Sequence, residues 1–122
     1  MKVDDPDPIQ LWQSISAWYA EFASMHNWEY LIPMVALTTW IGEQPFATNL
    51  YPSTSHEWLC VHLVPGFNRD QSFFSCCVKA GGEFECEAWA KVGQSLCRKS
   101  VPLDQDRMLF TEFVGKLTGA DA

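Results

Sequence analysis

A Gly81-Gly82 pair between two strand-like segments most constrains how this chain of 122 residues can fold. Two adjacent glycines are typical of a β-hairpin turn, because both can adopt positive φ. Residues 71–79 precede the pair and residues 83–92 follow it, so these segments predict two antiparallel strands. Pro65-Gly66 and Gly93-Gln94 mark further turns, which predict neighbouring strands at 56–64 and 95–101.

The segment before these strands is ambiguous. Residues 46–51 predict a short strand, closed by the turn-rich residues 52–55. Residues 28–42 fit a short helix starting near Pro33, or a buried strand ending at Gly42. We prefer a loop or short helix that leads into a strand.

The N-terminal part of the chain predicts an amphipathic helix. Asp7 suits the N-cap and Pro8 the first helical position. Two neighbouring apolar stripes follow at helical spacing, Leu11, Ile15, Trp18, Phe22 and Met25 on one and Trp12, Tyr19 and His26 on the other. A face this broad favours packing on a sheet, on a second subunit or on both, so we expect a homodimer.

The C-terminal part predicts a second helix. Asp104 suits its N-cap, and Leu103 and Met108 suit a hydrophobic staple around that cap. Gly119 lies where the helix would end. The expected buried stripe is Leu109 or Phe110, Phe113 and Leu117.

This element order predicts an α+β fold in a single domain over residues 1–122, with a flexible segment at 1–6. We expect an antiparallel meander of four to five strands, with the N-terminal and C-terminal helices packed on one face. The order is similar to that of small acidic secretion chaperones and profilin-like domains in architecture alone, and no motif identifies a family.

Charge is distributed unevenly along the chain. The net charge is −7, and the stretch from Val3 to Asn68 holds seven acids and no Lys or Arg. Five of the six Trp lie in the same stretch. Net negative charge argues against binding to nucleic acid or an anionic membrane, whereas acids with aromatic side chains suit a basic partner.

The chain predicts a cytoplasmic protein. Residues 1–10 contain no apolar segment typical of a secretory signal, and the longest uncharged run, 30–42, is short for a membrane span. Five cysteines without C-x-x-C spacing argue against a disulfide scaffold and favour reduced thiols.

A two-residue loop at Gly81-Gly82 would set the register of the hairpin. Cys77 would then face Cys86, where a cross-strand disulfide is geometrically possible, although reduced thiols are favoured. A turn at Gly93-Gln94 would likewise place Trp89 opposite Arg98, as a cation–π pair.

Three candidate ligands or nucleophiles, His56, Cys60 and His62, share one face of the strand at 56–64 with Trp58. The two histidines would lie about 20 Å apart in an extended strand, too far to share a metal ion. Cys60 and His62 could form a nucleophile pair, but no third residue is identifiable to orient them. We therefore expect no catalytic residue, metal site or cofactor.

Glu83, Glu85 and Glu87 alternate with apolar residues, and share one strand face with Trp89 and Lys91. The leading hypothesis is a non-enzymatic acidic protein that binds a basic macromolecular partner, as an inhibitor, immunity protein or chaperone-like adaptor. Its expected partner-binding residues are Asp4, Asp5, Asp7, Glu83, Glu85, Glu87 and Trp89.

The alternative hypothesis is a small-molecule-binding domain. Its pocket would lie between helices and sheet and take a cationic or aromatic ligand. The expected walls are Trp28, Trp40, Tyr51 and Trp58.

Overall fold

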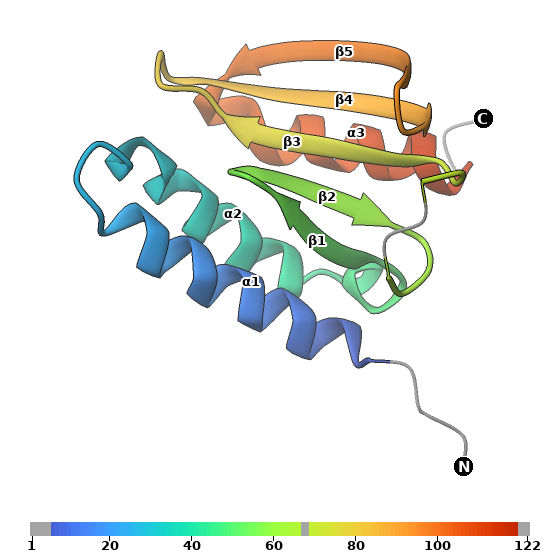
Figure 1. The fold of residues 1–122 in the computed structure, drawn as a ribbon, viewed down its shortest axis with the longest axis horizontal. Helices are drawn as coiled ribbons and strands as arrows, with labels where there is room; N and C mark the ends of the chain where they lie inside the picture. The colour runs from blue at the N-terminus through green and yellow to red at the C-terminus, as the bar shows by residue number, and fades with distance from the viewer. Residues whose placement is uncertain (1–5, 67–68, 120–122) are drawn as a thin grey trace.

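Two helices lead into a five-stranded sheet and a third helix follows it (Figure 1). The structure is a computed structural model and describes residues 6–66 and 69–119. Most of the expected flexible segment, residues 1–5, therefore lies outside the described residues. The elements are α1 (Pro8–Ala23), η1 (Glu29–Leu31), α2 (Ile32–Gly42), η2 (Pro45–Asn49), β1 (Tyr51–Ser55), β2 (Trp58–His62), β3 (Phe73–Val78), β4 (Glu83–Lys91), β5 (Gln94–Pro102), η3 (Leu103–Gln105) and α3 (Asp106–Thr118).

The strands form one antiparallel meander in the order β1-β2-β3-β4-β5. Figure 1 shows α1 and α2 side by side across β1 and β2, and α3 behind β3 and β4. The fold is therefore α+β with N-terminal and C-terminal helices, as the sequence predicts.

Both terminal helices pack on the same face of the sheet, which we call the inner face. The Phe74 ring of β3 lies 5.2 Å from the Phe110 ring of α3, and the Phe110 ring lies 6.4 Å from the Trp12 ring of α1. The other strand residues of this face include Leu59, Val61, Cys76, Val78, Phe84 and Cys86, all buried. A single hydrophobic core thus joins the three helices to the sheet.

Helix α1 begins as predicted, because the Asp7 carboxylate accepts a hydrogen bond from the Ile9 amide over 3.0 Å and Pro8 occupies the first turn. Trp12 and Tyr19 of the second predicted stripe are fully buried, whereas His26, its third member, lies beyond the helix and is exposed. Trp12 Nε1 donates to the Leu50 carbonyl over 3.1 Å, and Tyr19 Oη donates to the Glu57 carbonyl over 2.8 Å. These bonds tie α1 to both ends of β1.

Residues 32–42 form helix α2, so the strand interpretation of this segment is wrong. Helix α1 packs along α2, where Ser16 Oγ and Thr39 Oγ1 share a hydrogen bond of 2.7 Å. The second helix accounts for the broad apolar face of α1 within one chain. The homodimer stays a prediction.

The first strand begins later than predicted. Residues 45–49 form the 3-10 turn η2, and β1 covers Tyr51–Ser55, of which the sequence assigned Tyr51 to a strand and 52–55 to a turn. Strand β1 is at the edge of the sheet, where Pro52 removes no ladder hydrogen bond that a central strand would need.

The β3–β4 register differs by one residue from the prediction. Cys76, and not Cys77, lies opposite Cys86. The loop has three residues, because the Lys79 amide donates to the Glu83 carbonyl over 2.7 Å and Gly82 follows with φ of 89°. A type I turn followed by a residue in the left-handed region is a common three-residue hairpin loop. All five cysteines are free thiols.

The β4–β5 turn also differs from the prediction. Lys91 pairs with Gln94, so the turn consists of Val92 and Gly93. Arg98 consequently lies opposite Glu87, and the expected pairing of Trp89 with Arg98 is wrong. Strand β5 is an edge strand, and every residue in it except Val101 is exposed.

Helix α3 starts at Asp106, after the 3-10 turn η3, and Asp104 does not cap it. The expected staple is absent, since Met108 is 64% exposed. Gly119 ends the helix with φ of 76°, as predicted, and the buried residues include Leu109, Phe110 and Phe113. No helix within 6–66 or 69–119 is long and apolar enough to cross a membrane.

Replacement of Trp12 by Phe tests the hydrogen bond between α1 and the Leu50 carbonyl. We expect Trp12→Phe to lower the free energy of unfolding by about 2–3 kcal/mol in urea denaturation, because it leaves a buried carbonyl unpaired and creates a small cavity. Trp18→Phe is the control, since Trp18 is half-buried in α1. Equal destabilisation by the two substitutions would contradict this role of Trp12.

Candidate functional site

The face of the sheet opposite the helices, which we call the outer face, carries an unusual mixture of aromatic and polar side chains. Register places Cys60 of β2 beside Ser75 of β3, and Ser75 beside Glu87 of β4. Phe73 lies beside Trp89 in the next row. Alternation along each strand therefore brings these side chains to one surface.

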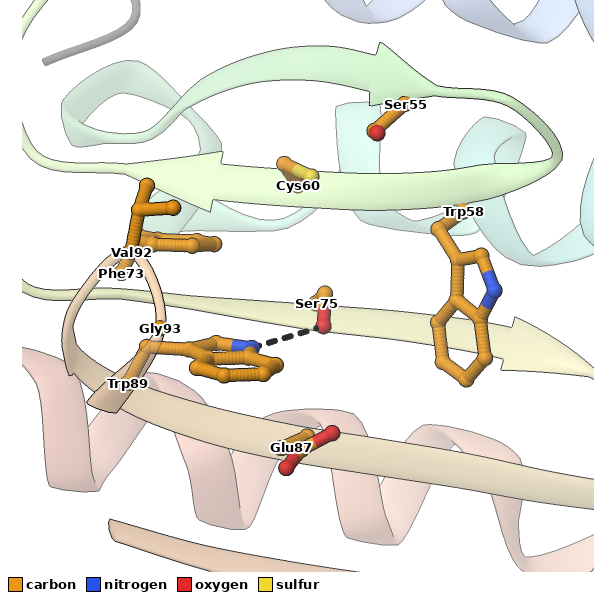
Figure 2. A pocket seen from close by; sticks show the side chains of 9 residues that line it. All are labelled: Ser55, Trp58, Cys60, Phe73, Ser75, Glu87, Trp89, Val92 and Gly93. Atoms are coloured by element: carbon orange, nitrogen blue, oxygen red, sulfur yellow. Dashed lines mark hydrogen bonds between the residues drawn. The ribbon is translucent and has the colours of Figure 1, made fainter. Parts of the chain in front are cut away.

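A pocket of about 260 Å³ opens on the outer face. Figure 2 shows Trp58 at one side of it and Trp89 at the other, with Cys60 and Ser75 between them and Glu87 beside Ser75. The residues that line the pocket are Ser55, Trp58, Cys60, Phe73, Ser75, Glu87, Trp89, Val92 and Gly93.

Three stacked rings hold one wall of the pocket in place. The His62 and Phe73 ring centroids are 5.2 Å apart with planes at 20°, and the Phe73 and Trp89 centroids are 6.0 Å apart with planes at 10°. Trp89 Nε1 also donates a hydrogen bond of 3.1 Å to Ser75 Oγ, which Figure 2 shows as a dashed line. Stacking and this bond together fix the orientation of the Trp89 indole.

The opposite wall, Trp58, already contacts a cation of the same chain. Lys79 Nζ lies 4.8 Å from the centroid of the Trp58 ring. This distance is within the range of a cation–π interaction. Part of the Trp58 indole is thus already covered by a cation of the same chain.

Glu87 is the only carboxylate that lines the pocket. It is half-buried, and it makes no hydrogen bond or ion pair with another residue in the part of the chain that the structure describes. Its cross-strand neighbour Arg98 does not come within ion-pair distance of it. By contrast, Glu85 accepts a hydrogen bond of 3.4 Å from Ser100 Oγ.

The residues predicted for partner binding divide into two groups. Glu83, Glu85, Glu87 and Trp89 share the outer face of β4, as the alternation predicts, and Glu87 and Trp89 line the pocket. Asp7 instead caps α1, a helix of the inner face. Asp4 and Asp5 lie outside the described residues.

The four aromatic residues predicted for a small-molecule pocket do not come together. The Trp28 ring packs 4.7 Å from Phe22, and the Trp40 ring packs 6.1 Å from Phe46. Tyr51 lies at the start of β1, opposite His62. Only Trp58 lines the pocket of the outer face, and that pocket is on the side away from the helices.

Sequence reasoning missed that Trp58 and Trp89 belong to one site. It also missed the residues that connect them, Phe73 and Ser75 of β3. A signal was available, because Phe73 and Ser75 alternate with Phe74 and Cys76 along a central strand. That alternation places them on the face shared by Trp58 and Trp89, once the register of the strands is known.

The Cys60 and His62 pair is not arranged as an activated nucleophile. Burial, with the Cys76 thiol nearby, raises the pKa of Cys60 to about 12, so this thiol is protonated at neutral pH. His62 Nε2 shares a hydrogen bond of 3.2 Å with Ser53 Oγ, and burial lowers the pKa of its imidazole. Among residues 6–66 and 69–119, no three His, Cys, Asp or Glu side chains are grouped to hold a metal ion.

Comparison with known proteins finds no matching family model, no similar curated protein and no similar solved structure. The site is therefore interpreted from its own geometry.

The exposure of the cysteines predicts their reactivity. Cys97 is exposed, whereas Cys60, Cys76, Cys77 and Cys86 are buried. We expect one rapid equivalent of thiol labelling in the native protein at pH 8, all five after unfolding, and none rapid in Cys97→Ser. A second fast thiol that is lost in Cys60→Ser would contradict the raised pKa of Cys60 and would favour an enzyme.

The pKa of His62 predicts how stability depends on pH. Burial lowers this pKa in the folded protein, so the unfolded chain takes up the proton more readily. The contribution of His62 to stability is therefore complete above about pH 6.5 and is lost as the pH falls towards the lowered pKa. Urea denaturation at pH 7.5 and 5.5 should show a smaller loss for His62→Gln than for the unmodified chain.

His26→Gln is the matched control, because the His26 side chain is 89% exposed. It should keep the full loss of stability between the two pH values. An equal loss in His62→Gln would argue against the burial effect.

Proposed function

We propose that the chain is a non-enzymatic binding protein that holds a basic macromolecular partner against the outer face of its sheet. One observation carries the proposal: the Glu87 carboxylate lies in a pocket with two indoles, and no described residue neutralises it. A carboxylate that no residue of its own chain neutralises remains available to a cation of a partner, and a charge-assisted hydrogen bond to it is stronger than a neutral one.

The charge of β4 supports a basic partner. Glu83 and Glu85 continue the outer face beyond Glu87, so three carboxylates follow one strand. Such a row attracts a basic protein over roughly a Debye length and raises its association rate. Trp58 and Trp89 beside Glu87 then provide the buried aromatic contacts from which interfaces gain most of their affinity.

The size of the pocket favours one side chain of a larger partner over a free ligand. Its volume of about 260 Å³ is below the range of about 300–1,000 Å³ that is usual for pockets of drug-sized molecules. The small-molecule hypothesis is therefore the weaker of the two. In addition, the four aromatic residues on which this hypothesis was based do not come together in one pocket.

An inhibitor, an immunity protein or a chaperone-like adaptor would each use such a surface. The absence of catalysis is part of the proposal, and the protonated Cys60 thiol supports it. Five free thiols fit a reducing compartment such as the cytoplasm.

Affinity capture with matched charge variants tests this function. The full chain is immobilised beside Glu87→Gln and beside Glu21→Gln, which removes an exposed charge from α1. A basic protein from the source cell should be retained by the unmodified chain and by Glu21→Gln. Retention by Glu87→Gln should fall at least about fivefold, because a charged hydrogen bond is lost.

Circular dichroism of each variant confirms that the bait is folded. Equal retention of every protein by the three baits would show that Glu87 has no part in binding and would refute the proposal.

A further inference from the structure

We infer that the pocket selects a guanidinium group, and that the side chain it takes from the partner is an arginine. This inference rests on the proposed function, because it names the group that the outer face would recognise. Three features of the pocket carry it: the free carboxylate, the ring faces that are already covered, and the hydroxyl next to the carboxylate.

The carboxylate of Glu87 favours a planar donor. Both of its oxygens are without a partner among the described residues. A guanidinium can donate two parallel N–H bonds to both oxygens, whereas an ammonium acts as a point charge. An arginine side chain can therefore bind both oxygens of the Glu87 carboxylate at once.

The rings around Glu87 do not form a cage for a methylated ammonium. Such a group is bound by aromatic faces that surround it. The two neighbours of Phe73, His62 and Trp89, are stacked on its ring with planes at 20° and 10°. Lys79 Nζ lies over the Trp58 ring. Few ring faces are thus left, and a flat guanidinium needs only one.

The same chain contains a guanidinium placed over an indole ring. The Arg107 guanidinium carbon lies 5.4 Å from the centroid of the Trp40 ring, on the other side of the sheet. This pair is an example of the cation–π contact that we infer for the ligand. It also supplies a control, because Trp40 does not line the pocket.

Ser75 completes the set of acceptors. Its Oγ accepts the Trp89 Nε1 proton over 3.1 Å and has a second lone pair. Ser75 and Glu87 are cross-strand partners, so their oxygens are on the same face. A guanidinium bound to Glu87 has further N–H groups for this hydroxyl.

Arg98 lies next to the pocket but does not pair with Glu87. It lies opposite Glu87 in the register, yet it is exposed and forms no ion pair within the described residues. Its positive charge competes weakly with an incoming cation. Removal of Arg98 should therefore leave binding unchanged or strengthen it slightly.

Three matched probes test the inference on the full chain. N-acetyl-arginine amide, N-acetyl-lysine amide and N-acetyl-trimethyllysine amide are titrated while the indole N–H signals are followed by NMR. We expect the Trp89 and Trp58 signals to shift with the arginine probe, with an affinity at least about fivefold above that for either lysine probe.

The variants identify the contacts. Glu87→Gln should weaken binding of the arginine probe at least about tenfold, because the paired charge is lost. Arg98→Ala and Trp40→Phe should retain it. Preserved dispersion of the other indole signals shows that each variant is folded.

The outcomes separate this inference from the proposed function. Equal or tighter binding of a lysine probe, or no response to the arginine probe, overturns the guanidinium inference, whatever the capture experiment gives. Loss of binding of the arginine probe in Arg98→Ala also overturns it, because a guanidinium bound to Glu87 gains nothing from a second positive charge beside it. Failure of the capture experiment alone refutes the basic partner.

Discussion

The burial of β3 on both faces is the constraint on which the rest of the structure depends. An antiparallel sheet commonly packs one face on its core and leaves the other in water. Every residue of β3 is buried, although the three helices pack on the inner face. On the outer face, side chains of the two neighbouring strands contribute to covering Phe73 and Ser75. Trp89 and His62 provide that cover by stacking on Phe73 from the two neighbouring strands.

The candidate site is a consequence of this cover. Side chains large enough to cover β3 must project over it from β2 and β4, and the hollow between them is the pocket. The aromatic residues on the outer face thus form the walls of the pocket, and not only a small second hydrophobic cluster. Glu87 distinguishes this pocket from simple hydrophobic packing, because a carboxylate does not stabilise an apolar contact. In the proposed complex, a cation of the partner would pair with this carboxylate.

The order and type of most elements could be predicted from local signals. Asp7 and Gly119 mark helix ends by backbone chemistry that needs no tertiary contact, and both predictions are confirmed. The register could not be predicted, because Gly82 as a third loop residue is indistinguishable from a two-residue loop in the sequence. That one-residue slip exchanged Cys76 and Cys77 between faces. Alternation within β4 does not depend on pairing, so the sequence predicts correctly that its three carboxylates share one face. The pocket could not be predicted in this way, because its residues come together only when three strands are in register.

Strand β5 also determines how copies of this chain can meet. It has nine residues, and none of the strands that the structure describes pairs with its outer edge, so this edge is a template for adding another strand. Full antiparallel pairing of two such strands would place Arg98 at the centre, opposite Arg98 of the second copy, with Lys99 adjacent on each. Like charges directly opposite one another destabilise a strand pair. The Arg98 pair therefore disfavours the fully paired arrangement of two copies along this edge.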